Sequence, residues 1–466
     1  MTAPIRYAIV GTGARAQMYI SALTGPYAAN AELTAWSDPN RGRLDWNERR
    51  VLAAGAPAPT RIDAEDLSTA VERLRIDRVI VTAPDFAHAD LVVAALHGGA
   101  DVVVEKPLTT DADGVRRIAD AVAATGRAVT VTFNYRYSPR NAELKRVIAS
   151  GAIGDVTSVH FEWLLDTSHG ADYFRRWHRQ KQNSGGLLVH KSSHHFDLVN
   201  WWLADLPVRV FASGGLRFYG ARNAERRGLR ERPVRGSVDD ARRDPFALDL
   251  RDHDVLRGLY YEQEQHDGYL RDRDVFDEGI SIEDNLSLIV DYAAGASMTY
   301  ALNAHSPWEG YTVAVNGTEG RAELSVVERG AILLDETGRQ HVVDPSARPE
   351  AVADETGRPV GDRLVVQRHF GAAREVSIPH AAGGHGGADD ALVRDLLIGA
   401  DVDPLQQAAT WLDGVRAMAV GVAGNDSLAS GAPVLIRNLD FGRAATAVSA
   451  TGSPTAAVAP AVSVPR

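Results

Sequence analysis

The stretch Ile5–Leu23, IRYAIVGTGARAQMYISAL, predicts a strand, a tight glycine turn and a helix in direct succession. Its first part, RYAIV, is rich in β-branched and aromatic residues, which is typical of a strand. Gly11, Gly13 and Ala16 follow at the spacing G-x-G-x-x-A. In a dinucleotide-binding turn the first glycine permits the bend, the second lets a pyrophosphate approach the backbone, and a small third residue lets the helix pack on the strand. Because the three parts stand in the required order, we interpret the stretch as a site for a nucleotide pyrophosphate at a helix N-terminus.

A second expected strand, ELTAWS at 32–37, ends directly before Asp38. A carboxylate about twenty residues beyond the glycine turn accepts hydrogen bonds from the adenosine ribose hydroxyls and repels a 2′-phosphate. We therefore predict NAD as the cofactor. Arg41 and Arg43 lie close by and leave NADP possible. The structural alternative is that Asp38 only opens a turn before Pro39.

Strand and helix signals continue to alternate up to residue 133, with strand-like runs at 77–84, 101–107 and 127–135. Such alternation predicts an α/β fold with a doubly wound parallel sheet, a Rossmann domain over residues 1–133. Ligands of such sheets lie at the carboxyl ends of the strands. We expect the cofactor to contact the glycine turn and these strand ends, at Gly11, Thr12, Gly13, Ala14, Arg15, Asp38, Thr82, Pro84, Glu105, Lys106 and Asn134.

Length and composition narrow the class of protein. A chain of 466 residues is expected to form two domains. The net charge of −11 argues against a nucleic-acid or anionic-membrane surface. The absence of cysteine excludes disulfides, thiolate zinc sites, iron–sulfur clusters and cysteine nucleophiles. The N-terminus lacks the pattern of a signal peptide, and no apolar run reaches about 20 residues, so we expect a cytoplasmic protein without a membrane span.

Several stretches together resemble the Gfo/Idh/MocA family, the glucose–fructose oxidoreductase and inositol dehydrogenase group. They are GTGARA (11–16), TAPDFAH (82–88), EKPL (105–108), the run from 134 to 163, GGLLVHKSSHHFDLVNWW (185–202), and the runs 283–302 and 315–324. The resemblance implies a second α/β domain with a large, open, mostly antiparallel sheet, which we assign to 134–443 with an insertion at about 214–280. It also implies sugars, polyols or their derivatives as substrates, and a homodimer or homotetramer formed through the open sheet face. Residues 444–466, rich in Ala, Pro and Ser, are predicted to be disordered.

The same resemblance suggests roles for single residues. Lys106 matches the family lysine near the nicotinamide and the reacting carbon, and His88 matches a loop histidine that supports the cofactor pocket. The family helix usually reads D-x-G-x-H-x-x-D. Here His194 and Asp197 match that pattern, whereas His190 stands in place of the aspartate and Ser192 in place of the glycine.

The segment VHKSSHHFD (189–197) lies in a predicted helix that covers 185–203. In one continuous helix His190, His194 and Asp197 would share a face. A zinc site is one interpretation, but Lys191 occupies the position of the glutamate in H-E-x-x-H, so we predict no metal. A structural polar cluster is another. We favour an acid–base site, with His194 as general base, Lys106 as its electrostatic partner, and His190 as a second proton carrier or substrate contact.

Four residues are predicted to bind substrate: Arg136, Lys191, Asp197 and His385. His385 lies in the glycine-rich loop GGHGGAD (383–389), which is similar to a loop of the NAD-dependent glycosidase branch of the family. The insertion is expected to cover the site. Within it we interpret HDGYLRDRDVFDE (266–278) as a solvated loop, with contact to the substrate as the alternative.

Three functions follow from these patterns. The first is an NAD-dependent dehydrogenase of a sugar or polyol. The second is a redox-neutral glycoside hydrolase, in which bound NAD oxidises a ring hydroxyl before elimination, hydration and reduction. The third is a sensor that binds NAD without catalysis, against which Lys106 and His194 argue.

Overall fold

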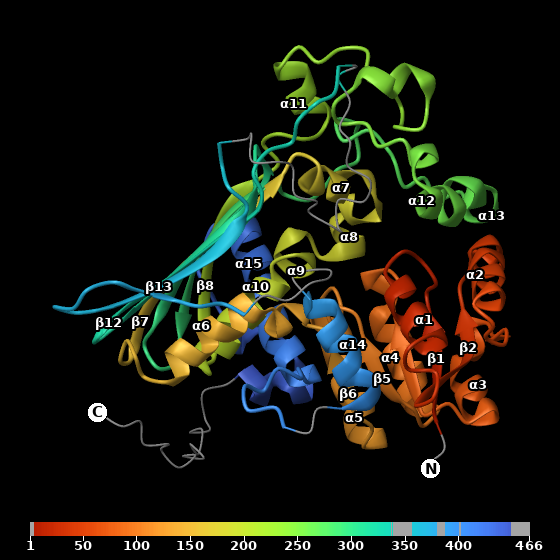
Figure 1. Ribbon diagram of the computed structural model, residues 1–466, viewed down its shortest axis with the longest axis horizontal. Coiled ribbons are helices and arrows are strands. Elements are labelled where there is room, and N and C mark those ends of the chain that lie inside the picture. The colour runs from red at the N-terminus through yellow and green to blue at the C-terminus, as the bar shows by residue number, and fades with distance from the viewer. Residues whose placement is uncertain (1–3, 337, 339–356, 380–386, 400–401, 449–466) are drawn as a thin grey trace.

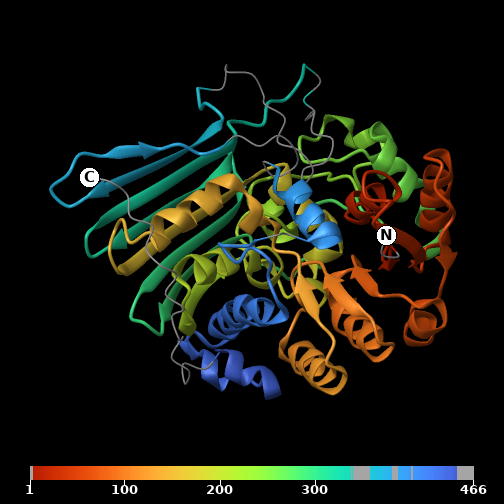
Figure 2. The same ribbon diagram turned by 60° about the horizontal axis from the view of Figure 1, so that its bottom comes forward.

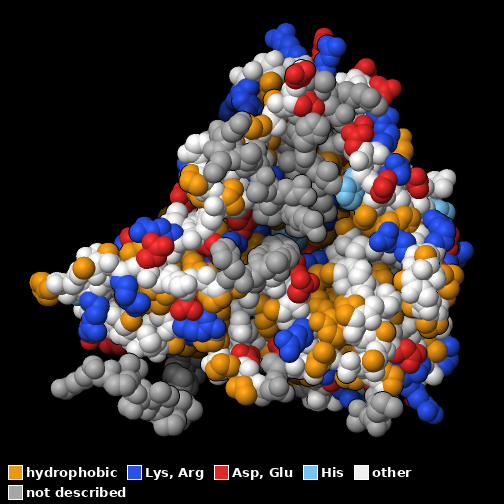
Figure 3. Space-filling view, in the orientation of Figure 1, with side chains coloured by type: hydrophobic (Ala, Val, Ile, Leu, Met, Phe, Trp, Pro, Cys, Tyr) orange, Lys and Arg blue, Asp and Glu red, His pale blue; other side chains and the backbone are white. Residues whose placement is uncertain are grey.

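The computed structural model describes residues 4–336, 338, 357–379, 387–399 and 402–448. Figure 1 shows two lobes beside each other, a six-stranded sheet with helices on both faces and a larger open sheet, with the insertion above them. No helix within these ranges is long and apolar enough to cross a membrane. Charged side chains of both signs are interspersed over the face in Figure 3.

The first sheet has the strand order β3-β2-β1-β4-β5-β6, and all its neighbouring strands run parallel. The strands are β1 Ile5–Val10, β2 Ala31–Ser37, β3 Thr60–Arg61, β4 Arg78–Val81, β5 Asp101–Val104 and β6 Val129–Val131. The helices are α1 Ala16–Thr24, α2 Arg41–Ala53, α3 Leu67–Leu74, α4 His88–His97 and α5 Ala112–Thr125. The predicted Rossmann fold is confirmed. The apolar runs of β4 and β5 are buried because helices cover both faces.

The second sheet has nine strands in the order β14-β13-β12-β11-β7-β10-β9-β8-β15, antiparallel except for the pair β7 and β10. The strands are β7 Val156–Asp166, β8 Pro207–Gly215, β9 Asn285–Tyr292, β10 Ser297–Ser306, β11 Glu309–Gly317, β12 Gly320–Arg329, β13 Gly361–Arg368, β14 Arg374–Val376 and β15 Val434–Leu435. The helices α6 Pro139–Ala149, α10 Ser193–Leu203 and α15 Trp411–Ser430 cover one face, as Figure 2 shows, and the other face is open. The predicted open sheet is confirmed.

Two expectations about elements need correction. The predicted helix 185–203 is divided into α9, Leu187–His190, and α10, because the His190 carbonyl oxygen accepts hydrogen bonds from Ser193 Oγ and Lys106 Nζ. Residues 444–448, expected to be disordered, belong to a short 3-10 helix, Gly442–Val448, that buries Ala444. Helix α14, Ala388–Ile398, lies late in the chain but packs its apolar residues on the first sheet.

The insertion between β8 and β9 forms α11 Ala221–Arg226, α12 Asp254–Leu259, α13 Glu264–Asp267 and short 3-10 turns. It reaches across to α2 of the Rossmann domain (Figure 1). Gly258 permits this approach, since a Cβ there would lie 2.0 Å from Trp46 Nε1. The interpretation of 266–278 as a solvated loop is wrong, because Arg271 and Asp272 are 1% exposed and Phe276 is 2% exposed.

Candidate active site

A cleft of about 1080 Å³ runs between the two domains, from the glycine turn to α9 and α10. Rossmann strand ends, α7 (His169–Arg175), the α9–α10 junction and the insertion form its walls. Every predicted cofactor residue except Thr12 lines it, and Thr12 is buried beneath it. The strand ends, the histidine segment and the insertion therefore meet at one site, as the sequence suggested.

The glycine turn fits a dinucleotide pyrophosphate. Gly11 has φ +90°, and a Cβ there would lie 2.6 Å from the backbone nitrogen of Ala83, so only glycine is accommodated. Gly13 is open on the cleft side up to Tyr260 of the insertion, whose hydroxyl would lie 3.0 Å from a Cβ. The same hydroxyl accepts a hydrogen bond of 2.9 Å from the amide of Ala14. These residues leave backbone at the start of α1 close to the cleft, as phosphate binding requires.

Asp38 lies at the end of β2 and lines the cleft. Its carboxylate accepts hydrogen bonds from the Thr12 amide at 2.8 Å and the Asn40 amide at 2.8 Å, which fix its orientation. Arg43 is 3.4 Å from Asp38 and 2.8 Å from Asp267 of the insertion. Arg43 is thus neutralised by two carboxylates, one from each domain.

Polar side chains at the base of the cofactor end bond one another. Arg15 Nε donates to Glu105 at 2.7 Å, and its guanidinium contacts Asp389 of α14 at 3.2 Å. Asn134 donates to the same Asp389 carboxylate at 2.8 Å. His88 is completely buried, and its ring nitrogens lie 2.8 Å from the carbonyl oxygen of Pro107 and 2.9 Å from that of Ala83. The contacts of His88 join the loops after β4 and β5, which agrees with a supporting role.

Lys106, His190 and Asp85 form a continuous chain at the other end of the cleft. Lys106 Nζ is 3.2 Å from His190 Nε2, and His190 Nδ1 bonds the carboxylate of Asp85. In the tautomer that satisfies both contacts, Nδ1 carries the proton toward Asp85 and Nε2 accepts from the ammonium. All three side chains line the cleft. This carboxylate–imidazole–amine chain is able to move a proton.

Burial sets the protonation of the three groups. It lowers the pKa of Lys106 to about 8, an effect that the charge of Asp85 partly opposes. Burial, together with the nearby Lys106 charge, lowers the pKa of His190 well below its usual value. Burial raises the pKa of Asp85, and Lys106 and Arg176 oppose that shift. A lysine that titrates near neutral pH beside a neutral histidine suits acid–base catalysis.

His194, on α10, also lines the cleft. Its ring stacks on Tyr135 with centroids 4.3 Å apart and meets the edge of Phe133. Lys191 donates to the Tyr135 hydroxyl at 3.1 Å and lines the cleft as well. The neighbouring His195 points into the core, where it contacts Tyr300. Although α9 and α10 are separate, His190 and His194 both reach the cleft, whereas Asp197, expected on the same face, does not line it.

Two predicted substrate residues lie outside the cleft. Arg136 and Asp197 form a buried bidentate ion pair, with contacts of 2.7 and 2.6 Å. Arg136 also donates to the carbonyl oxygen of Gln406. The pair joins the loop after β6 to α10, so its geometry favours a structural role over substrate binding. His385 lies outside the described residues, and among those residues no group of histidines and carboxylates has the arrangement of a metal site.

Comparison with known proteins agrees with this geometry. Residues 5–133 match the Gfo/Idh/MocA oxidoreductase family model for the NAD-binding Rossmann fold, and 145–436 match its model for the C-terminal α/β domain. The chain belongs to this family. The Bacillus subtilis (strain 168) protein YteT, named an oxidoreductase, is 33% identical over 92% of this chain and 97% of its own.

Two further proteins that this chain resembles are less similar to it than YteT is. Inositol 2-dehydrogenase 1 of Saccharopolyspora erythraea is 32% identical, over 44% of this chain and 56% of its own length. The structure of an Agrobacterium radiobacter oxidoreductase in complex with NAD⁺, L-tartaric acid and magnesium has a TM-score of 0.58 at 16% identity. It covers 93% of this chain and 99% of that one, which shows a shared fold.

Within the Gfo/Idh/MocA framework, Asp85 is the main residue that sequence reasoning missed. His190 replaces the aspartate of the family helix pattern, and Asp85, on the loop after β4, places a carboxylate beside it. The signal was present in TAPDFAH, but the partner lies 105 residues away. Other lining residues were also missed: His169, Asp172, Arg176, His178 and Tyr260. Tyr269 and Arg271 line the cleft too, and they belong to 266–278, for which contact with the substrate was the alternative interpretation.

Proposed function

We propose that this protein oxidises a secondary alcohol of a sugar, a polyol or a related compound, with NAD as hydride acceptor. The observation that carries the proposal is the chain Asp85–His190–Lys106 in the interdomain cleft, beside the carboxyl ends of β4 and β5. Relatives named inositol 2-dehydrogenase support a hydroxyl-bearing ring as the substrate class.

The chain accounts for the proton released in the reaction. NAD, when bound, supplies the hydride acceptor, and the protein takes up the hydroxyl proton. Lys106 in its neutral form accepts that proton, and its contact with His190 Nε2 offers a path onward. The carboxylate of Asp85 stabilises His190 when the imidazole carries the extra proton. Lys106 and His190 are thus the proposed catalytic residues, Asp85 a positioning residue, and His194 remains a candidate general base.

The surroundings of Asp38 support NAD over NADP. A 2′-phosphate would approach the Asp38 carboxylate and would depend on a free cation nearby. Arg43 already contacts Asp38 and Asp267, and its Nε donates to the carbonyl oxygen of Leu259. A phosphate would have to compete with both carboxylates for this guanidinium.

A redox-neutral glycoside hydrolase is the second candidate. The observation that favours it is the bridge over the cofactor end, where Tyr260 bonds the Ala14 amide and Asp267 bonds Arg43. Such a bridge favours slow release of NAD. The hydrolase reaction requires this because the same NAD is reduced and reoxidised within one catalytic cycle. His169 and His178 line the substrate end and are further acid–base groups for elimination and hydration.

One experiment separates these functions. The purified protein is incubated with NAD and a panel of free sugars, polyols and nitrophenyl glycosides, while NADH absorbance and nitrophenol release are followed together. Stoichiometric NADH supports the dehydrogenase. Nitrophenol release without NADH accumulation supports the hydrolase. Tight NAD binding with neither signal would contradict both and favour a sensor.

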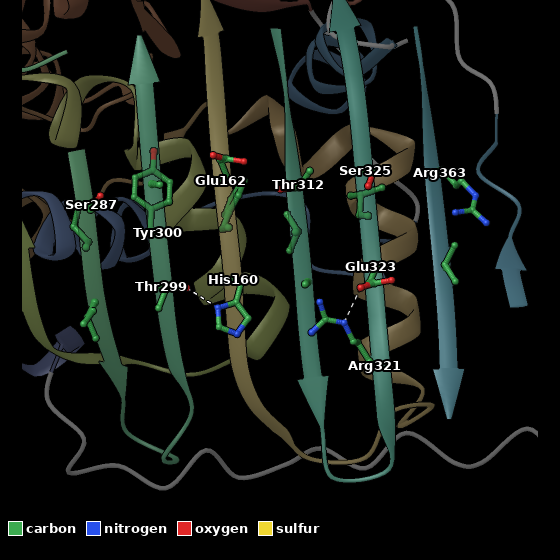
Figure 4. Close-up of a pocket in the computed structure, with 18 of the residues that line it drawn as sticks. His160, Glu162, Ser287, Thr299, Tyr300, Thr312, Arg321, Glu323, Ser325 and Arg363 are labelled. Carbon is green, nitrogen blue, oxygen red and sulfur yellow. Dashed lines mark hydrogen bonds and ion pairs between the residues drawn. The ribbon is translucent and has the colours of Figure 1, made fainter. Parts of the chain in front are cut away.

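We further propose that the protein forms a homodimer or homotetramer through its open sheet. Figure 4 shows the outward side chains of this face, mostly polar, with His160 bonded to Thr299 and Arg321 paired with Glu323. Ile289 lies on the same face and is 50% exposed. Light scattering should report an oligomer that Ile289→Arg weakens, whereas a monomeric wild-type protein would contradict the proposal. The cysteine-free chain is compatible with the expected cytoplasmic location, which cell fractionation tests.

A further inference from the structure

Two arginines that line the cleft are held by one carboxylate. Asp172 of α7 accepts from Arg176 at 3.0 Å and from both terminal nitrogens of Arg271 at 3.2 and 3.4 Å. Arg176 and Arg271 line the cleft, and Arg271 comes from the insertion. The Nε atoms of both are buried without a hydrogen-bond partner in the described part of the chain. The guanidinium groups are therefore fixed in position but incompletely satisfied.

The charges in this part of the cleft do not balance. Four cations, Lys106, Arg176, Lys191 and Arg271, line it, against the carboxylates Asp85, Glu105 and Asp172, of which Glu105 is also paired with Arg15. Glu309 lies behind His169, to which it bonds at 2.6 Å, and is shared with Arg329. The arginine charges lower the pKa of Asp172 to about 2 against the effect of burial, so its negative charge is retained. An excess of buried positive charge is costly unless a ligand supplies an anion.

The position of Arg176 relates this excess to the reaction centre. The ring of Trp177, the residue after Arg176, meets the His190 imidazole edge-on with centroids 5.9 Å apart, and Arg176, Trp177 and His190 all line the cleft. Guanidinium groups bind planar carboxylates with two parallel hydrogen bonds. An acidic sugar carries such a group a few bonds away from its secondary hydroxyls.

We propose that Arg176 and Arg271, oriented by Asp172, bind the carboxylate of an acidic sugar while Lys106 and His190 act on one of its hydroxyl groups. The inference rests on the proposed function and names the substrate class for it. The cofactor pyrophosphate is a second candidate for the anion. Arg271 lies 5.4 Å from the ring centroid of Tyr260, and the Tyr260 hydroxyl bonds the Ala14 amide of the glycine turn. The experiment must separate the two.

The test compares matched uronates and neutral hexoses, such as glucuronate with glucose and galacturonate with galactose, and their nitrophenyl glycosides. Binding to the NAD-loaded protein is measured by calorimetry, and turnover by NADH and nitrophenol. The wild type should prefer the uronate. Arg176→Gln should reduce this preference by about 10- to 100-fold, the usual effect of losing a hydrogen bond between charged groups. Arg176→Lys should restore it only in part. Arg226→Gln, an exposed arginine of the insertion, serves as the control.

The readouts keep the two proposals distinct. Uronate binding without turnover of any compound would contradict the proposed function and leave the anion site standing. Turnover with equal affinity for uronate and neutral sugar would overturn the anion site alone. A wild-type preference that Arg176→Gln leaves intact, while its affinity for NADH falls tenfold or more, would assign the arginines to the pyrophosphate and also overturn it. Because Arg271 is nearly fully buried, Arg176, with a 21% exposed side chain, is the residue to vary first.

Discussion

Replacing Asp85 by asparagine tests the proton chain most directly. Asparagine keeps the shape of the side chain, and its carbonyl oxygen still accepts from His190 Nδ1, but the charge is lost. In the wild type Asp85 opposes the effect of burial on Lys106, whose pKa is about 8. The negative charge of Asp85 raises the pKa of Lys106, so that pKa must fall further when the carboxylate is removed. A nearby opposite charge typically shifts a pKa by about 1 to 3 units, which leads us to expect the Lys106 pKa to fall by roughly one to two units.

The assay is the pH dependence of kcat/KM for alcohol oxidation. If neutral Lys106 takes the proton, the rate rises with pH up to the Lys106 pKa. In Asp85→Asn the midpoint of this limb should move to lower pH by the same roughly one to two units. The plateau should drop by about 10- to 100-fold, since the imidazolium of His190 loses its carboxylate. Asp63→Asn removes an exposed carboxylate at the mouth of the same cleft and should not move the limb. A limb that stays at the wild-type pH in folded Asp85→Asn would refute the reasoning.

Three further predictions concern the catalytic candidates Lys106 and His194, the choice between NAD and NADP, and metals. Lys106→Met should lower kcat by about 10²- to 10⁴-fold, while NADH fluorescence still reports cofactor binding. A comparable loss of kcat in His194→Ala would keep His194 as general base. Near-normal kinetics in both variants would place the chemistry elsewhere. Asp38→Ala should narrow the preference for NAD over NADP by about 1–2 kcal/mol in measured Kd values, and tighter NADP binding by the wild type would contradict the assignment. Chelator treatment should leave activity intact, whereas loss of activity together with a stoichiometric metal would reverse the prediction.

Local sequence signals were sufficient for the parts of the fold that depend on neighbouring residues. The strand–turn–helix at Ile5–Leu23 forms from a single short stretch, and the structure confirms it. The break after His190 was not visible in the sequence. It depends on hydrogen bonds from Lys106 and from Ser193 to the His190 carbonyl, and on a bond between Ser192 and Tyr300.

The insertion illustrates a second reason for failure. Its segment 266–278, rich in Arg and Asp, predicted a solvated loop, because isolated charges are rarely buried. In the structure these charges pair with one another, as Arg235 does with Glu264 and Asp272, and Arg232 with Asp274. Paired charges tolerate burial. Composition alone does not show which charges meet, so the burial of this segment was not predicted.

The two departures from the family helix pattern have one structural explanation. An aspartate at position 190 would place its carboxylate directly against Lys106, whereas a histidine there is longer and leaves its second nitrogen in need of an acceptor. Asp85 supplies that acceptor from the loop after β4, so the acid–base chain takes Asp85 and Lys106 from the Rossmann domain and His190 from the second domain. Ser192, in place of the usual glycine, bonds Tyr300 and helps to hold α9 and α10 in their divided arrangement. It follows that exchanging His190 for aspartate alone should not restore the usual family site, because Asp85 and the new carboxylate would then be two buried anions facing one lysine.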